Sequence, residues 1–174
     1  MSSRLRGEGE PFTVRPANES DLEQVNAIYN HYIRETAITF DIEPWTIEAR
    51  REWFGHYAPS GRHRLLVAVA DQVLGYASSS RFRPKAAYET SLETSIYCAP
   101  WATGRGIGTA LYAALFDALA GEDVHRALAG ITMPNDPSLA LHRRFGFKKA
   151  AYFTEQGRKF GRYWDVLWLE KPLP

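Results

Sequence analysis

Apolar residues recur at helical spacing in one stretch near the middle of the chain, and the predicted fold is organised around it. They fall at i, i+3, i+4 and i+7 between residues 107 and 119: Ile107, Ala110, Leu111, Ala114, Leu115, Ala118 and Leu119. Gly121 follows, at a position where helices often end in a left-handed residue. Residues 92–97, just upstream, read as a strand that runs into a turn at Pro100. The pattern therefore predicts a strand, a loop and a helix in succession.

Similar patterns on either side predict two helices upstream, one downstream and six more strands. Ser20 and Glu23 form a capping box ahead of an apolar stripe that continues to residue 33, and a second helix covers residues 46–57. Asp136 as N-cap and Pro137 as first residue open a short helix that Gly146 ends. Short apolar or alternating runs predict strands at residues 12–15, 64–70, 73–81, 126–132 and two within 148–170. The predicted order is β-α-α-β-β-β-α-β-α-β-β, in a single domain over residues 12–174 behind a flexible tail of residues 1–11.

Composition narrows the class of protein. With 174 residues, 45% of them hydrophobic, and a net charge of +1, the chain suits one soluble domain and gives no reason to expect a nucleic acid or an anionic membrane as partner. The longest apolar run, residues 65–70, is too short to span a bilayer, and residues 1–11 lack the apolar core of a signal peptide. The single Cys98 excludes an internal disulfide and reads as a packed thiol. We therefore expect a cytoplasmic protein that uses no metal.

The loop between the central strand and the central helix has three closely spaced glycines, Gly104, Gly106 and Gly108. The first N–H groups of a helix have no partner within it and carry a partial positive charge, so such a loop suits a phosphate or pyrophosphate. A mononucleotide P-loop is excluded because no Lys follows Gly108, and a dinucleotide fingerprint is incomplete because Thr109 occupies the third glycine position. A tight strand-to-helix turn without a ligand explains the glycines equally well.

This loop resembles the acetyl-CoA pyrophosphate loop of the GCN5-related N-acetyltransferases (GNAT), [QR]-x-x-G-x-[GA], with Gly106 and Gly108 at the two small positions and Thr103 where the family usually has Gln or Arg. Three further strings resemble the phosphinothricin and methionine sulfoximine N-acetyltransferases of that family. They are LETSIY at residues 92–97, PNDPSxxLH at residues 134–142 and GxKxGxxxDV at residues 157–166. The resemblance extends from about residue 12 to the C-terminus. It implies an α+β fold in which a mixed, mostly antiparallel sheet splays open to receive acetyl-CoA.

The resemblance also implies which residues bind acetyl-CoA as the co-substrate. The expected contacts are Ile96, Tyr97, Cys98, Thr103, Gly104, Arg105, Gly106, Ile107, Gly108, Asn135 and Ser138. Among them, a backbone N–H of Ile96 or Tyr97 would donate to the developing oxyanion, and Asn135 would bond to the pantetheine arm. The acetyl group would pass directly to the acceptor in a ternary complex.

Two residues are candidates for the proton transfer that acetylation of an amine requires. Glu93 shares one strand face with Ser95 and Tyr97 and is the candidate general base. An α-amine has a pKa of about 8 and a free Glu about 4.3, so burial or a water relay must narrow the difference. His142 is the second candidate, as a neutral group that orients a water or shares in the deprotonation. A solvent-facing or ion-paired Glu93 and a structural His142 remain the alternatives.

The acceptor pocket is predicted from a basic loop upstream of Glu93. Arg83, Lys85 and Tyr88 suit a small amine that also carries a carboxylate and a phosphinate, sulfoximine or sulfone oxygen. The resemblance adds Phe40 to this pocket, whereas Arg158 departs from the family pattern. A solvated loop explains the same cations.

These observations predict an N-acetyltransferase for the α-amino group of phosphinothricin, methionine sulfoximine or methionine sulfone. The resemblance implies a homodimer, for which Tyr163, Trp164 and Trp168 are interface or core residues. Two alternatives remain. One is an acetyltransferase for another amine, namely a protein N-terminus, a polyamine or an aminoglycoside. The other is a non-catalytic sensor of acyl-CoA.

Overall fold

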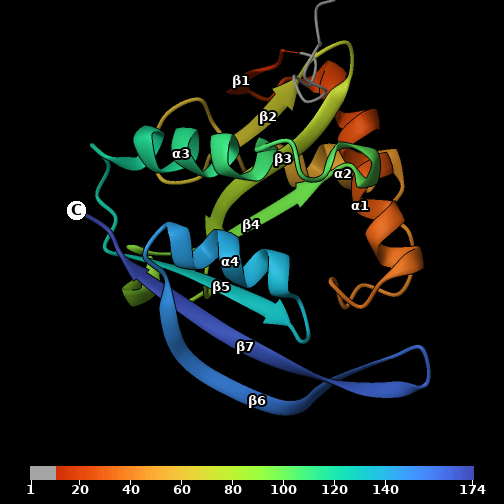
Figure 1. The fold of residues 1–174 in the computed structure, drawn as a ribbon. Helices are drawn as coiled ribbons and strands as arrows, with labels where there is room; N and C mark the ends of the chain where they lie inside the picture. Colours follow the sequence, from red (N-terminus) through yellow and green to blue (C-terminus); the bar gives the residue numbers. More distant parts are fainter. Residues whose placement is uncertain (1–10) are drawn as a thin grey trace, which may run out of the picture.

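The computed structural model describes residues 11–174, which form one seven-stranded sheet with helices on both faces (Figure 1). The strands lie in the order β1-β2-β3-β4-β5-β7-β6, and all neighbouring strands are antiparallel except β4 and β5. Along the chain the elements are β1 (Thr13–Pro16), α1 (Leu22–Glu35), α2 (Ile47–Phe54), β2 (Leu65–Val69), β3 (Val73–Arg81), β4 (Ser91–Cys98), α3 (Ile107–Leu119), β5 (Arg126–Thr132), α4 (Asp136–Arg144), β6 (Lys148–Lys159) and β7 (Arg162–Pro172). The predicted order of helices and strands is confirmed.

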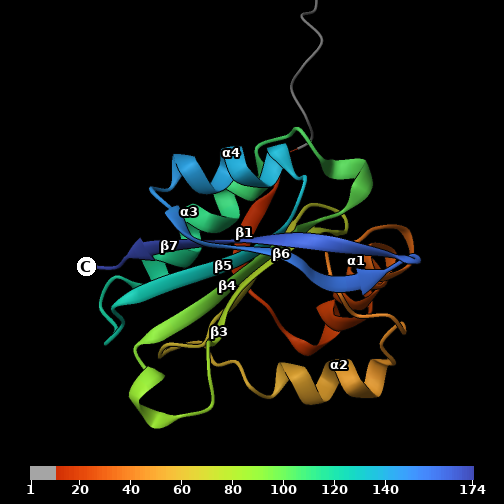
Figure 2. The same ribbon diagram turned by 90° about the horizontal axis from the view of Figure 1, so that it is seen from below.

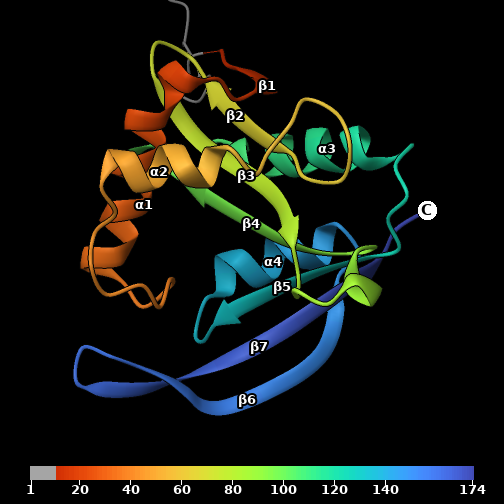
Figure 3. The same ribbon diagram turned by 180° about the vertical axis from the view of Figure 1, so that it is seen from behind.

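The helices divide between the two faces of the sheet. Figure 2 shows α3 and α4 on one face and α1 and α2 on the other, and Figure 3 gives the view onto α1 and α2. The apolar side chains of α3 face the sheet: Ile107, Leu111, Leu115 and Leu119 are at most 2% exposed. Burial of each such side chain stabilises the fold by about 1.5–3 kcal/mol. Within the described residues, no helix is both long and apolar enough to cross a membrane.

The register of β4 against β5 creates an opening in the sheet. These two strands pair only through Ser91–Arg126, Leu92–Ala127 and Glu93–Leu128. β4 nevertheless continues beside β3 as far as Cys98, and β5 continues beside β7 as far as Thr132. The pairing therefore ends after Glu93, and Figure 1 shows β4 and β5 diverging from each other.

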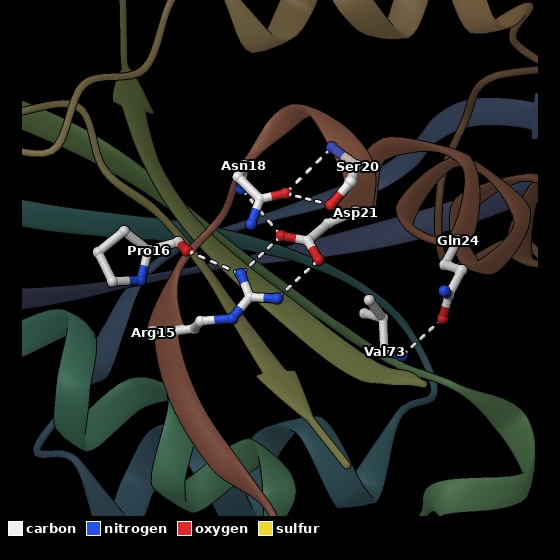
Figure 4. A network of polar contacts seen from close by, with 7 residues as sticks. All are labelled: Arg15, Pro16, Asn18, Ser20, Asp21, Gln24 and Val73. Carbon is white, nitrogen blue, oxygen red and sulfur yellow. Dashed lines mark hydrogen bonds and ion pairs between the residues drawn. The ribbon is translucent and has the colours of Figure 1, made fainter. Parts of the chain in front are cut away.

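Three predicted helix ends are wrong by one or two residues. The capping box at the start of α1 consists of Asn18 and Asp21, because a 3-10 turn (Glu19–Asp21) precedes the helix; the Asp21 carboxylate accepts from the Asn18 N–H at 2.8 Å and pairs with Arg15 at 2.8 Å (Figure 4). In α4 the N-cap is Asn135, whose Oδ1 accepts from the Ser138 N–H at 3.3 Å. α3 ends at Leu119 and its C-cap Ala120 has an ordinary helical φ of −64°; Gly121 has no positive φ and is therefore not a left-handed cap.

Candidate active site

A cavity of about 790 Å³ occupies the opening between β4 and β5. Side chains from both faces of the sheet line it, because β4 directs successive residues to opposite sides. The side that includes Glu93 and Tyr97 lies toward α1 and the segment of residues 36–46. We call this segment the acceptor loop, after the acceptor contact predicted for Phe40. The other side lies toward α3 and α4. The lining residues include Glu93, Tyr97, Phe40, Tyr112, His142 and the glycine loop.

Glu93 lies where the strands part. It is the last residue of β4 that pairs with β5, and its half-buried side chain lines the cavity. Burial raises the pKa of this carboxyl, and the positive charge of Arg83 partly offsets the rise. A carboxylate with a raised pKa that remains open to a cavity is a better proton acceptor than an ordinary surface Glu.

His142 is held in one tautomer by two hydrogen bonds on α4 and α3. Its Nδ1 lies 2.7 Å from the Ser138 carbonyl oxygen, which can only accept, so Nδ1 carries the proton. Its Nε2 then accepts from the Tyr112 hydroxyl at 2.9 Å. The side chain is 1% exposed, and burial lowers its pKa. His142 is therefore neutral, and Tyr112 occupies the nitrogen that a base would use.

Tyr112 belongs to the cavity although the sequence analysis missed it. Its hydroxyl lies 2.9 Å from His142 and 3.4 Å from the Thr94 Oγ1, and its side chain is fully buried. Tyr112 directly follows Leu111 in α3 but is not part of the apolar stripe. The stripe alone therefore does not indicate that Tyr112 makes a polar contact with α4.

The glycine loop adopts the conformation that its glycines allow. Gly104 and Gly106 have φ values of +76° and +75°, which side-chain-bearing residues rarely adopt, and Gly106 is the N-cap of α3. A Cβ on Gly108 would lie 3.2 Å from Leu141 of α4, so that glycine permits close helix packing. The first turn of α3 thus presents its N–H groups to the cavity, as an anion requires.

Most of the residues predicted to bind the co-substrate lie on this cavity. Those that line it are Ile96, Tyr97, Cys98, Thr103, Gly104, Gly106, Ile107, Gly108, Asn135 and Ser138. Arg105, from the same loop, is not among the lining residues. Burial raises the pKa of the Cys98 thiol to about 11, which favours the packed thiol over a thiolate nucleophile.

Hydrogen bonds and ring contacts from α1 and α2 hold the acceptor loop in place. Tyr29 of α1 and the indole Nε1 of Trp45 both donate to the Asp41 carboxylate, the latter at 3.0 Å. Behind Trp45, the Arg50 guanidinium is 1% exposed, with its carbon 4.3 Å from the centre of the Trp45 ring. Phe40 lies within this loop and lines the cavity, while its contact with the acceptor stays a prediction.

The basic loop, unlike the acceptor loop, does not line the cavity. Arg83, Lys85 and Tyr88 are exposed in the turn between β3 and β4, and none of them lines the cavity. Arg83 affects the cavity through its positive charge, which lowers the pKa of Glu93. Side chains that the sequence analysis missed, Thr39, Gln156 and Trp168, contribute to the lining. Among residues 11–174, no group of three or more His, Cys, Asp and Glu is close enough to hold a metal ion.

Comparison with known proteins identifies the family of this chain and, through it, an enzyme of the transferase class. Residues 14–168 match the family described as the acetyltransferase (GNAT) domain, so the chain belongs to the GNAT acetyltransferases. The phosphinothricin N-acetyltransferase of Streptomyces coelicolor is 57% identical over 163 residues, which cover 92% of this chain and 95% of that protein. The L-methionine sulfoximine/L-methionine sulfone acetyltransferase of Pseudomonas aeruginosa is 33% identical, with 92% and 94% covered.

A solved relative shows the same fold. The GNAT superfamily phosphinothricin acetyltransferase of Sinorhizobium meliloti, determined in complex with acetyl-CoA, has a TM-score of 0.88 and 31% sequence identity, over 93% of this chain and 88% of that one. These findings confirm the predicted family, the α+β fold and the prediction that the chain is an acetyltransferase.

Proposed function

We propose that this acetyltransferase uses acetyl-CoA to acetylate the α-amino group of a small amino-acid-like compound of the phosphinothricin and methionine sulfoximine or sulfone type. The observation that carries the proposal is the position of Glu93 at the point where β4 and β5 separate, on the wall of one cavity that also holds the glycine loop. The names of the relatives at 57% and 33% identity support the acceptor class.

The residues of the cavity fit acetyl-CoA. The glycine loop and the first residues of α3 line the cavity, and the N–H groups at the start of a helix, which have no partner within it, suit a pyrophosphate. The part of β4 beyond Glu93 has no ladder with β5, and a backbone N–H of Ile96 or Tyr97 would donate a hydrogen bond to a thioester oxygen. Asn135 and Ser138 on the α4 side would contact the pantetheine arm.

Glu93 would act as the general base. When bound, acetyl-CoA supplies the acetyl group. A carboxylate oxygen of Glu93 takes a proton from the acceptor ammonium, directly or through one water, and leaves the free amine as nucleophile. Because burial raises the pKa of Glu93, the transfer is less uphill than it is for an ordinary Glu. The acetyl group would then pass directly to the amine in a ternary complex: the C–N bond forms as the thioester C–S bond breaks, and CoA leaves as the thiol after its sulfur takes up the second amine proton.

For His142 we propose a positioning role. It is neutral, and its hydrogen bonds to Ser138 and Tyr112 tie α4 to α3 beside the gap. A second, water-orienting role would require the Tyr112 hydroxyl to release Nε2.

The acceptor class is tested by following thiol release from acetyl-CoA with a thiol-reactive dye. The panel contains L-phosphinothricin, L-methionine sulfoximine, L-methionine sulfone, spermidine, kanamycin and a short peptide. Release with the amino-acid analogues alone is the expected result. Release with the polyamine, aminoglycoside or peptide instead would contradict the acceptor class, and tight acetyl-CoA binding without release would indicate a sensor.

We further propose that the protein is a cytoplasmic homodimer. The β6–β7 hairpin has four exposed aromatic side chains: Tyr152, Phe153, Phe160 and Tyr163. Trp164 and Trp168 are less exposed, and Trp168 lines the cavity instead. Light scattering of the purified protein would give the mass of a dimer, and a monomer at micromolar concentration would contradict this proposal.

A further inference from the structure

The acceptor loop meets the β6–β7 hairpin directly over the cavity. Figures 1 and 3 show the segment after α1 next to the turn of the hairpin. Two contacts join them. The Phe40 ring lies against Gly157, and the ammonium of Lys159 donates to the Thr39 carbonyl at 2.8 Å. Gly157 and Lys159 are two residues apart on β6, and Thr39 and Phe40 are consecutive.

The contact between Gly157 and Phe40 leaves no room for a side chain. A Cβ built on Gly157 would lie 2.5 Å from the Phe40 Cδ2 and 2.6 Å from its Cζ, which is far inside van der Waals contact. The φ angle of Gly157 is outside the left-handed region, so its backbone accepts an alanine. Glycine is therefore required at position 157 to make room for the Phe40 ring, and not to allow a special backbone conformation.

The acceptor loop cannot easily yield to such a clash. On one side of Phe40, the Thr39 hydroxyl bonds to Tyr29 at 2.8 Å, and Lys159, only 4% exposed, holds its carbonyl. On the other side, Asp41 accepts from the Tyr29 hydroxyl and from the indole of Trp45. Residues on both sides of Phe40 are thus fixed by buried or half-buried groups.

The hairpin is fixed in register at the same place. The pairing of β6 with β7 shifts between Phe153 and Gly157, which marks a bulge. The Asp165 carboxylate holds that bulge, accepting from the Glu155 N–H at 2.7 Å and from the Tyr152 hydroxyl at 2.6 Å. A bulge changes the direction in which the following residues point, and this one sets Gly157 against the acceptor loop.

We propose that Gly157 is a specificity-determining residue, which sets the size of the acceptor side of the cavity by giving the Phe40 ring its place, and that Lys159 is the positioning residue that keeps the loop there. This inference rests on the proposed function, because it takes the Phe40 wall as the acceptor wall. Without the slot at residue 157, the ring has to leave the position in which it lines the cavity.

The test is Gly157→Ala, with kcat and KM measured for L-phosphinothricin, L-methionine sulfone and the shorter L-2-aminobutyrate. We expect kcat/KM to fall about tenfold or more for the two long acceptors, mainly through KM, and less for the short one, since one methyl group changes a pocket by this order. The dissociation constant of acetyl-CoA should stay unchanged. The matched control is Gly121→Ala, where an added Cβ meets nothing within 4 Å.

A double variant separates this role from a general loss of stability. Phe40→Leu alone shortens the wall, and in Gly157→Ala/Phe40→Leu it should recover kcat/KM relative to Gly157→Ala, because the clashing ring is gone. If Gly157→Ala matches the wild type, weakens acetyl-CoA binding as much as acceptor binding, or is not relieved by Phe40→Leu, the inference is wrong. A wild type that acetylates none of the acceptors would contradict the proposed function instead.

Lys159→Met tests the second contact, with the exposed Lys149→Met of the same strand as its control. The side chain keeps its length and loses its hydrogen bond to Thr39, so the KM of the acceptor should rise about threefold to tenfold. An unchanged acceptor KM in Lys159→Met, or an equal rise in both variants, would remove Lys159 from the inference.

Discussion

The two faces of β4 differ in the freedom of their titratable groups. Toward α1, Tyr97 packs on Tyr29 with ring centres 5.2 Å apart. Glu93 lies on this face at the cavity, and within the described residues no hydrogen bond holds its carboxyl group in one state. Toward α3 and α4, the Thr94 hydroxyl lies 3.4 Å from Tyr112, whose own hydroxyl is committed to His142. On one face, the carboxyl group of Glu93 is free to exchange a proton with a molecule in the cavity. On the other face, Tyr112 and His142 are hydrogen-bonded to each other.

The alternation of side chains along a strand makes this division possible. Because neighbouring residues of β4 point to opposite faces, Glu93 and Thr94 lie beside the same gap and still reach different surroundings. Burial can therefore tune the pKa of the proposed base, Glu93, without disturbing the residues on the α3–α4 side. The following variants test whether the two faces are in fact independent.

Glu93→Gln should have the largest effect. The amide keeps the shape of the side chain and cannot accept the proton, so kcat should fall about 10²–10⁴-fold while the affinity for acetyl-CoA stays the same. Steady-state kinetics and a binding titration measure the two quantities. Full activity of the variant between about pH 6 and pH 9, a range that brackets the pKa of the amine, would show that Glu93 is not the base.

Tyr112→Phe should act on stability before it acts on chemistry. The change leaves the buried Nε2 of His142 without its donor, and we expect the free energy of unfolding to fall by about 1–3 kcal/mol. Urea denaturation followed by tryptophan fluorescence gives this value. A loss of kcat as large as that of Glu93→Gln, with stability retained, would instead make the α3–α4 face part of the proton transfer.

Gly106→Ala should weaken only the co-substrate side. A side chain at a φ of +75° costs about 1–2 kcal/mol, and relaxation of the loop should raise the KM for acetyl-CoA about tenfold with little change for the acceptor. Gly61→Ala is the control, because Gly61 has a φ of +86° and lies outside the cavity lining. Equal kinetic losses in the two variants would mean that backbone strain, and not the anion site, is responsible.

Arg83→Ala should give the smallest effect, which is a shift in pH dependence. The positive charge of Arg83 lowers the pKa of Glu93, so its removal raises that pKa further. Glu93 must be ionised to accept a proton, and the acid limb of kcat/KM should therefore move to higher pH, by less than about one unit for an exposed charge. Arg81→Ala, at the end of β3 and two residues before Arg83, should leave the acid limb in place.

The sequence was sufficient for the fold and for one side of the site. Strong periodicity predicted the order of the helices and strands, and the spaced glycines predicted the loop at the start of α3. The helix caps were wrong by small offsets, because Asn18 and Asn135 compete with equally good neighbours at the sequence level. Such a competition is decided by the turn that precedes the helix.

The parts that the sequence did not reveal depend on contacts between distant segments. Tyr112 reaches His142 from another helix, and Phe40 reaches Gly157 only because a bulge fixes the register of the hairpin. Neither contact leaves a periodic signal in either segment. For the same reason, the loop of Arg83, Lys85 and Tyr88 was predicted as part of the pocket from its residue types, while its position relative to the cavity depends on the turn after β3.

The three residue pairs between β4 and β5 have a mechanical consequence. Within the sheet of residues 11–174, this ladder of three pairs is the only one that joins β1–β4 to β5–β7, and it is the shortest ladder of the sheet. A molecule that lies in the opening and contacts both β4 and β5 would add contacts across the position where the sheet has the fewest strand pairs of its own. Filling the gap should therefore slow amide exchange in β5 and β7 as well as at the residues in contact.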